Sequence, residues 1–215
     1  MKFNKNTKWD CTIIGAGIIG LTTAYKYQKL FPNQKVLLIE KERQIFMHQS
    51  GRNSGVIHSG IYYEPDSYKA KNCIKGYDEL LSFAKKNKVP FKITGKLIIA
   101  SQESDISILE KLFKNGVKNG LDGIKILDKN EALKIEPYCK NIIKALYVPQ
   151  SGIINYKIIG NKLLEKFKVL GGTVNLSTQL FKLLKLKILS IFKQIKEKLN
   201  QKKLLYALEF LWIIF

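Results

Sequence analysis

Three glycines and one glutamate near the N-terminus have the types and spacing of a nucleotide-binding turn. Gly15, Gly17 and Gly20 follow a short apolar run, and Glu40 ends a second apolar run after an intervening helical pattern. The elements follow the order strand, glycine turn, helix, strand, acid. In this order the first glycine permits a tight turn. The second lets the backbone approach a pyrophosphate, and the third lets the helix pack closely on the sheet.

The chemistry of such a turn is the binding of phosphate and ribose. Phosphates lie against free backbone N–H groups at the positive end of the helix dipole. The Glu40 carboxylate can accept hydrogen bonds from ribose hydroxyls, and it would repel a 2′-phosphate, which disfavours NADP. The pattern therefore predicts a site for the ADP half of FAD or NAD. The alternative is an ordinary strand–helix–strand turn in which the acid is incidental.

A second stretch, residues 48–63, mixes glycines with small hydrogen-bonding side chains, two histidines and two tyrosines. A surface loop could have this composition, but few loops carry histidine and aromatic residues among so many glycines. A chain that wraps a large polar cofactor needs this mixture. Small residues let the backbone come close, while Ser50, Asn53 and Ser54 can donate hydrogen bonds to phosphate oxygens.

Together the two motifs resemble those of FAD-dependent oxidoreductases of the D-amino-acid-oxidase superfamily. Within it, the resemblance is greatest to the L-2-hydroxyglutarate oxidase/dehydrogenase family. The resemblance runs from about residue 9 to about residue 178. It includes shorter matches at residues 67–70, Cys73, residues 95–100, residues 136–137 and residues 149–156.

This resemblance implies an α/β fold, a Rossmann-like FAD-binding domain with an inserted part of an α+β substrate domain, in truncated form. It implies FAD rather than NAD, and oxidation of a 2-hydroxy acid, L-2-hydroxyglutarate, by hydride transfer to the flavin. The electron acceptor would be oxygen or a quinone. The cofactor contacts that it implies are Gly15, Gly17, Ile19, Gly20, Glu40, Lys41, Ser50, Asn53, Ser54, Gly55 and Val56.

His58 is the candidate catalytic residue, because the resemblance places it near the isoalloxazine. It could take the hydroxyl proton as a general base, hydrogen-bond the flavin, or stabilise a tight turn. Arg52 could pair with a substrate carboxylate through its planar fork, or lie solvated in the loop. We expect His48 on the surface beside a helix, and Tyr62 and Tyr63 in packing roles, although one of the two hydroxyls could reach the site.

The elements that would position these residues follow from apolar periodicity and from start and stop signals. A capping box, Asp128-x-x-Glu131, predicts a short helix that Pro137 closes. Three longer helices are expected at residues 68–88, 104–119 and 157–170. Strands are expected at residues 91–100, within a second sheet, at residues 142–148, and at residues 173–176, which should return to the flavin sheet.

The domain organisation that the resemblance implies, applied to these elements, has four segments. They are residues 1–89, the first part of the FAD-binding domain; residues 90–148, a partial substrate domain; residues 149–180, the return to the FAD-binding domain; and residues 181–215, an atypical basic and apolar helical tail.

Composition narrows the choice of partners. The net charge of +20 comes from 37 Lys and Arg against 17 Asp and Glu, but the lysines are spread along the chain without an arginine-rich run. We therefore expect no nucleic-acid partner. Cys11, Cys73 and Cys139 are far apart and form no C-x-x-C, so we expect a reduced, cytoplasmic protein without a metal site.

The tail of residues 181–215 has two interpretations. It could be an amphipathic, basic helix that gives peripheral contact with the inner membrane, since its last apolar run is shorter than the ~20 residues needed to span a bilayer. It could also be a truncation or frameshift product. The alternative functions are accordingly a non-catalytic dinucleotide-binding fragment, or a related flavoenzyme that acts on glycerol 3-phosphate or an amino acid.

Overall fold

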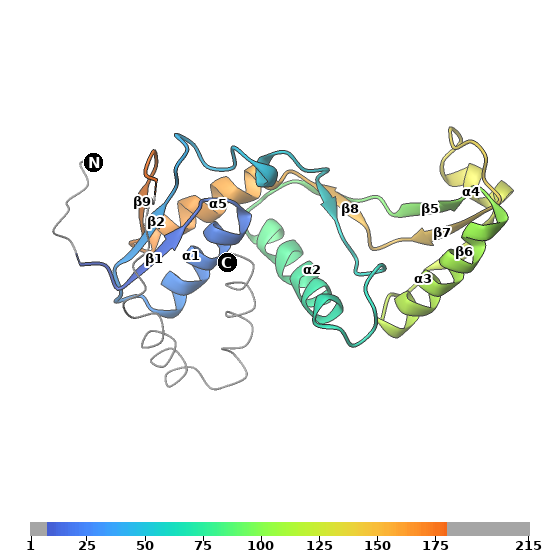
Figure 1. Ribbon diagram of the computed structural model, residues 1–215, viewed down its shortest axis with the longest axis horizontal. Helices are drawn as coiled ribbons and strands as arrows, with labels where there is room; N and C mark the ends of the chain where they lie inside the picture. The colour runs from blue at the N-terminus through green and yellow to red at the C-terminus, as the bar shows by residue number, and fades with distance from the viewer. Residues whose placement is uncertain (1–7, 180–215) are drawn as a thin grey trace. The chain divides into compact units, whose positions relative to one another are not determined.

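The computed structural model describes residues 8–179, which form two compact units (Figure 1). The first unit contains residues 8–52 and 156–179, and the second contains residues 53–155. Among the described residues, no helix has both the length and the apolar character needed to cross a membrane. The domain boundaries predicted from the sequence rest on the family resemblance, and they stay a prediction.

The first unit is built on a parallel sheet in the order β1 (Cys11–Ile14), β2 (Val36–Ile39), β9 (Thr173–Asn175). All of β2 is buried, as is typical of a central strand that is covered on both faces. The helix α1 (Ile18–Leu30) joins β1 to β2. The parallel pairing of β9 with β2 confirms the predicted return to this sheet.

The helix α5 (Tyr156–Val169) packs against α1, as two neighbouring helices of the first unit. Its Phe167 is completely buried, and a Cβ on Gly172 would overlap the Phe167 ring. The helix ends where the sequence predicts, and Gly171 there has a φ of +91°, which few residues other than glycine adopt.

The segment after β2 is fixed to α5 by Phe46. This side chain is only 6% exposed, and its ring lies where a Cβ on Gly160 of α5 would be. Phe46 has a φ of 63°, a left-handed conformation that costs roughly 1 kcal/mol or more outside glycine. A Cβ on Gly51 would overlap the Phe46 carbonyl oxygen, so the end of this segment is also tightly packed.

The second unit contains two small antiparallel sheets. One has the order β3 (Val56–Ile57), β8 (Gly152–Ile154), β4 (Phe91–Ile93). The other has the order β5 (Lys96–Ala100), β7 (Lys144–Val148), β6 (Lys125–Asp128).

The prediction that residues 91–100 belong to one sheet is therefore wrong. Gly95, with a φ of +73°, turns the chain between β4 and β5, and the Thr94 and Gly95 N–H groups both donate to the Ser151 carbonyl oxygen. After this turn the chain pairs with β7 instead of β8. The strands β3, β6 and β8 were not expected, because each is too short to show a period.

Three helices of the second unit agree with the sequence patterns. They are α2 (Tyr68–Lys86), α3 (Ile106–Lys118) and α4 (Lys129–Ile135), and α3 and α4 pack on the sheet of β5, β7 and β6. The capping box of α4 is confirmed, since Asp128 Oδ1 accepts from the Glu131 N–H at 2.8 Å and Glu131 Oε2 accepts from the Asp128 N–H at 3.0 Å. The main buried cluster of this unit is Ile61, Ala100, Leu109, Ile124, Leu146 and Val148.

Candidate functional site

The glycine turn between β1 and α1 has the geometry that its sequence predicts. Gly15 has a φ of +93°, which reverses the chain at the end of β1. A Cβ on Gly20 would overlap the Gly15 carbonyl oxygen, so the first turn of α1 can lie this close to the strand only with glycine at that position. Gly15 is therefore required by its backbone conformation, and Gly20 by packing within the first unit.

The N-terminus of α1 presents hydrogen-bond donors. Gly17 is its N-cap and supplies no side-chain acceptor, and the first turn holds no acidic residue. Ser50 Oγ accepts from the Ile18 N–H at 3.0 Å. The N–H groups of Ile19 and Gly20 have no acceptor among residues 8–179. Free donors at the positive end of a helix are suited to phosphate.

Ser50 lies directly over the turn. A Cβ on Gly17 would be 2.9 Å from Ser50 Oγ, so a larger residue at position 17 would displace this hydroxyl. Ser50 belongs to the short 3₁₀ helix η1 (Gln49–Gly51), which the packing of Phe46 and Gly51 holds in the first unit. The structure thus brings together residues of the fingerprint and of the second motif.

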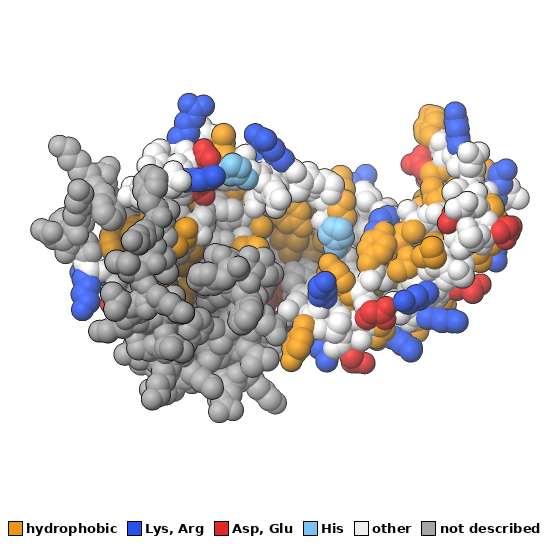
Figure 2. Space-filling view, in the orientation of Figure 1, with side chains coloured by type: hydrophobic (Ala, Val, Ile, Leu, Met, Phe, Trp, Pro, Cys, Tyr) orange, Lys and Arg blue, Asp and Glu red, His pale blue; other side chains and the backbone are white. Residues whose placement is uncertain are grey.

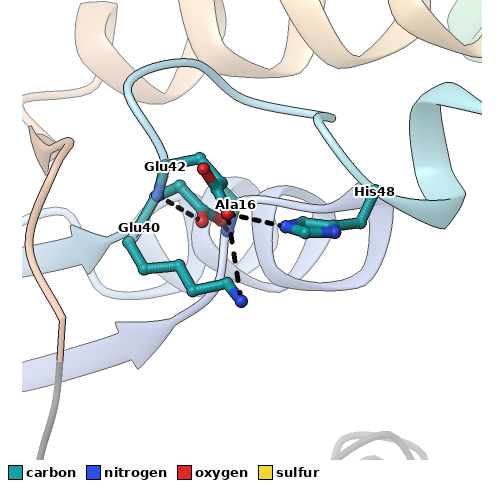
Figure 3. Close-up of polar contacts among 5 residues, drawn as sticks. Ala16, Glu40, Glu42 and His48 are labelled. Atoms are coloured by element: carbon teal, nitrogen blue, oxygen red, sulfur yellow. Dashed lines mark hydrogen bonds and ion pairs between the residues drawn. The ribbon is translucent and has the colours of Figure 1, made fainter.

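Glu40 closes the turn from the other strand (Figure 3). Its carboxylate accepts from the Ala16 N–H at 2.6 Å and from the Glu42 N–H at 3.0 Å, and the residue is only 9% exposed. Each carboxylate oxygen therefore has one protein donor. An ionised carboxylate has about four acceptor positions, so room for ribose hydroxyls remains in its hydrogen-bonding capacity.

Charged side chains surround the end of β2 at the surface. Glu42 Oε1 is 2.8 Å from His48 Nε2 and 3.9 Å from Lys41 Nζ, as Figure 3 shows for the histidine. The side chains of His48 and Lys41 are 62% and 55% exposed. His48 therefore lies on the surface beside η1, as expected. Arg52, also exposed, follows η1.

The remaining predicted cofactor contacts lie in the second unit. Asn53 Oδ1 accepts from the Gly55 N–H at 2.9 Å, and Gly55 has a φ of +70°. The Gly55 carbonyl oxygen accepts from the Ile154 N–H at 2.8 Å, which joins this loop to β8. Ser54 is exposed and Val56 half-buried. The predicted residues thus form two groups, Gly15 to Ser50 in one unit and Asn53 to His58 in the other.

His58 follows β3 and is exposed. Partial desolvation lowers the pKa of His58 below its ordinary value, and the positive charge of Lys96 lowers it further. The imidazole is therefore neutral at pH 7, and one of its ring nitrogens is a proton acceptor.

Lys96 is a functional candidate that the sequence patterns did not indicate, and Tyr62 is one that they gave only as an alternative to packing. Lys96 Nζ donates to Tyr62 Oη at 3.0 Å and lies 4.3 Å from the centre of the Tyr62 ring. Tyr62 is 50% exposed, whereas Tyr63 is half-buried. Lys96 and Tyr62 are 34 residues apart in the sequence, so no local spacing reveals their contact.

Two further observations concern the distribution of charge and of potential metal ligands. Lys and Arg side chains are scattered over the visible face of the described residues and form no single block (Figure 2). Within residues 8–179, no group of three or more His, Cys, Asp or Glu side chains could hold a metal ion.

The sequence model of the DAO family, described as FAD dependent oxidoreductase, matches residues 10–185. The L-2-hydroxyglutarate dehydrogenase of Indibacter alkaliphilus is 46% identical over 170 residues, which are 79% of this chain and 42% of that protein. The mitochondrial L-2-hydroxyglutarate dehydrogenase of Homo sapiens is 36% identical over 168 residues, which are 78% of this chain and 36% of that protein. The chain therefore spans less than half the length of these relatives.

Solved structures agree on the fold. FAD-bound L-alpha-glycerophosphate oxidase from Mycoplasma pneumoniae is 32% identical with a TM-score of 0.72, over 80% of this chain and 45% of that one. Glycine oxidase from Bacillus cereus, at 23% identity and a TM-score of 0.69 over 84% of this chain and 49% of that one, shows the fold alone. These matches confirm the resemblance, the α/β fold and the cofactor predicted from the sequence: the chain belongs to the DAO family of FAD-dependent oxidoreductases, whose cofactor is FAD.

Proposed function

We propose that this chain supplies the FAD-binding part of an enzyme that oxidises L-2-hydroxyglutarate to 2-oxoglutarate. The observation that carries the proposal is the 46% identity with the L-2-hydroxyglutarate dehydrogenase of Indibacter alkaliphilus over 170 residues. That identity extends over 79% of this chain, which includes residues of both compact units.

In this proposal the first unit holds the ADP half of FAD. The pyrophosphate would lie against the free N–H groups of Ile19 and Gly20, with the Ser50 hydroxyl beside it. The ribose hydroxyls would use the acceptor capacity that Glu40 retains beyond its bonds to Ala16 and Glu42. Lys41 would contribute through its charge, because its side chain lies at the surface near Glu40.

The second unit would act on the flavin end and on the substrate. Asn53, Ser54, Gly55 and Val56 would line the phosphates and the flavin ring. His58 would take the proton of the substrate hydroxyl, because a lowered pKa keeps its imidazole neutral and able to accept. FAD, when bound, supplies the acceptor for the hydride that leaves C2, so the substrate loses two electrons and becomes the 2-oxo acid.

The test is spectroscopic. Purified protein is titrated with FAD by calorimetry, and the FAD-loaded protein is mixed anaerobically with the L or D enantiomer of 2-hydroxyglutarate. We expect the absorbance near the flavin maximum to bleach with the L enantiomer only, and His58→Gln to slow the bleaching with little effect on FAD affinity. A folded protein that does not bind FAD contradicts the proposal, and a yellow protein that never bleaches identifies a non-catalytic FAD-binding fragment.

A second candidate substrate has its own support. The likeness to L-alpha-glycerophosphate oxidase, at 32% identity and a TM-score of 0.72, favours glycerol 3-phosphate as the alternative. The same bleaching assay with this compound distinguishes the two. Oxygen and a quinone remain the candidate electron acceptors, and reoxidation of the bleached protein by each separates them. The proposed membrane contact of residues 181–215 lies outside the described residues.

A further inference from the structure

The positive charge of Lys96 is not neutralised by an acidic side chain of the described chain. No carboxylate of residues 8–179 lies within 4.0 Å of Lys96 Nζ, although the residue is half-buried. The acidic residues that follow Tyr62 are engaged elsewhere: Glu64 pairs with Lys111 at 3.1 Å, and Asp66 with Lys71 at 3.9 Å. A cation that has no counterion and lies beside a phenolic hydroxyl favours the binding of an anion.

Tyr62 presents a further donor beside Lys96, and two buried serine hydroxyls of the same unit have no partner within residues 8–179. Tyr62 Oη accepts a hydrogen bond from Lys96 Nζ, so the phenolic O–H of Tyr62 remains able to donate. The hydroxyls of Ser59 and Ser151 are buried and have no hydrogen-bond partner among residues 8–179. Ser59 follows His58 in the chain, and the Ser151 carbonyl oxygen accepts from the N–H of Gly95, which precedes Lys96.

The backbone holds these groups in place before any ligand arrives. The turn that carries Tyr62 is closed by a bond from the Tyr63 N–H to the Gly60 carbonyl oxygen at 3.1 Å. Asn119 Nδ2 donates to the carbonyl oxygens of both residues, at 3.3 Å to Gly60 and 2.9 Å to Tyr63. Lys96 is the first residue of β5 and pairs with Val148 of β7. Groups fixed in this way lose little freedom when they bind a ligand.

We propose that Lys96 and Tyr62 bind a carboxylate group of the substrate, beside His58. The ammonium group would supply charge and the Tyr62 hydroxyl a directional hydrogen bond, and an ionised carboxylate is an acceptor that satisfies both. This inference deepens the proposed function and rests on it for the identity of the substrate. Lys96 and Tyr62 would thus select anionic 2-hydroxy acids over neutral alcohols.

The experiment uses glutarate, which has the carboxylates of the proposed substrate but no hydroxyl to oxidise. Glutarate binding to the full chain is measured by calorimetry, and the His58 ring is followed by NMR. The chain has only two histidines, so His48→Gln assigns the signals. We expect glutarate to shift the His58 signal and to raise its pKa, since a bound anion offsets the charge of Lys96. The uncharged isostere glutaramide should do neither.

Variants separate recognition from structural support. Lys96→Met should weaken glutarate binding at least tenfold and abolish the response of His58, while also raising the His58 pKa in the absence of ligand. Lys96→Arg should restore part of the affinity, and Tyr62→Phe should weaken binding several-fold. Lys125→Met, which removes an exposed strand lysine of the same unit, should bind as the unmodified chain does.

Glutarate binding that Lys96→Met changes by less than twofold, with circular dichroism showing an intact fold, would overturn the inference. So would a His58 signal that ignores saturating glutarate. The proposed function fails separately: normal glutarate binding at Lys96, with FAD that L-2-hydroxyglutarate never bleaches, refutes the function and leaves the anion site standing. Bleaching with an unchanged KM in Lys96→Met refutes the anion site alone.

Discussion

The glycine turn of the first unit and the His58–Tyr62–Lys96 cluster of the second unit are built on opposite principles. In the turn, backbone atoms are packed so closely that Gly20 has no room for a Cβ, and the Glu40 carboxylate is engaged by two backbone N–H groups. In the cluster, exposed or half-buried side chains leave the charge of Lys96 without a counterion and the Tyr62 hydroxyl able to donate. The turn depends on close steric packing, so it tolerates few substitutions. The cluster depends on charge, so substitutions there should alter ligand binding more than stability.

Gly20→Ala should have the largest effect on stability. The added Cβ would overlap the Gly15 carbonyl oxygen, so α1 must move from the strand at a cost of about 3 kcal/mol in the free energy of unfolding. FAD affinity should fall at least tenfold, because the free N–H groups move with the helix. Urea denaturation and FAD titration measure the two effects.

The control for this change is another helical glycine in the second unit. A Cβ on Gly76 of α2 would meet nothing within 4 Å, so Gly76→Ala should stabilise the protein by about 0.5 kcal/mol through helix propensity. Equal destabilisation by both substitutions would show that the tight packing of Gly20 is not what makes the turn sensitive.

Glu40→Ala should have the next largest effect. The buried Ala16 N–H loses its acceptor, which we expect to cost about 2 kcal/mol in the free energy of unfolding. Glu42→Gln is the matched control, because Glu42 supports Glu40 only through its backbone N–H and its side chain makes surface pairs. If Glu42→Gln is as destabilising as Glu40→Ala, the surface pairs rather than the buried carboxylate hold the turn.

Asp128→Ala tests a polar contact of the second unit that depends on local geometry. Removing the capping carboxylate of α4 should cost about 1 kcal/mol in the free energy of unfolding. Asp128→Asn keeps an oxygen that can accept from the Glu131 N–H, so thermal and urea denaturation should place it close to the unmodified protein. If Asp128→Asn destabilises the protein as much as Asp128→Ala does, the carboxylate acts through its charge and not as a helix cap.

The smallest effect expected is the contribution of His58 to the pH dependence of the free energy of unfolding. Its pKa is lowered in the folded state, so the unfolded state binds the proton more readily. The contribution of His58 to stability is therefore present above about pH 6.5, its unfolded pKa, and is lost as pH falls toward the lowered folded value. Urea denaturation from pH 7.5 to 5 should show a weaker slope for His58→Gln and for Lys96→Met than for the unmodified protein.

The sequence was sufficient where contacts are local or follow a known order of elements. Gly15, Gly20 and Glu40 lie within one strand–helix–strand unit, so their spacing alone determined the turn. The capping box of Asp128 and Glu131 spans three residues. The two strands within residues 91–100 were misassigned to one sheet, because the positive φ of Gly95 is invisible in an apolar run.

The contact between Lys96 and Tyr62 could not be predicted from local spacing or from the order of the elements. Their contact depends on the turn at residues 60–63, which Asn119 holds, and on the register of β5 with β7. Both are long-range features, and the direction of a side chain at the start of a strand is not encoded in its neighbours.

The order in which the chain is synthesised matters for the glycine turn, because residues that lie much later in the sequence complete its surroundings. The strand β2 is flanked by β9, and the Glu40 carbonyl oxygen accepts a hydrogen bond from the Thr178 N–H. The segment after β2 also rests on Gly160 through Phe46. The codons for the fingerprint are translated before those for β9, so the nascent chain can complete this sheet and the geometry around Glu40 only after Thr178 has left the ribosome.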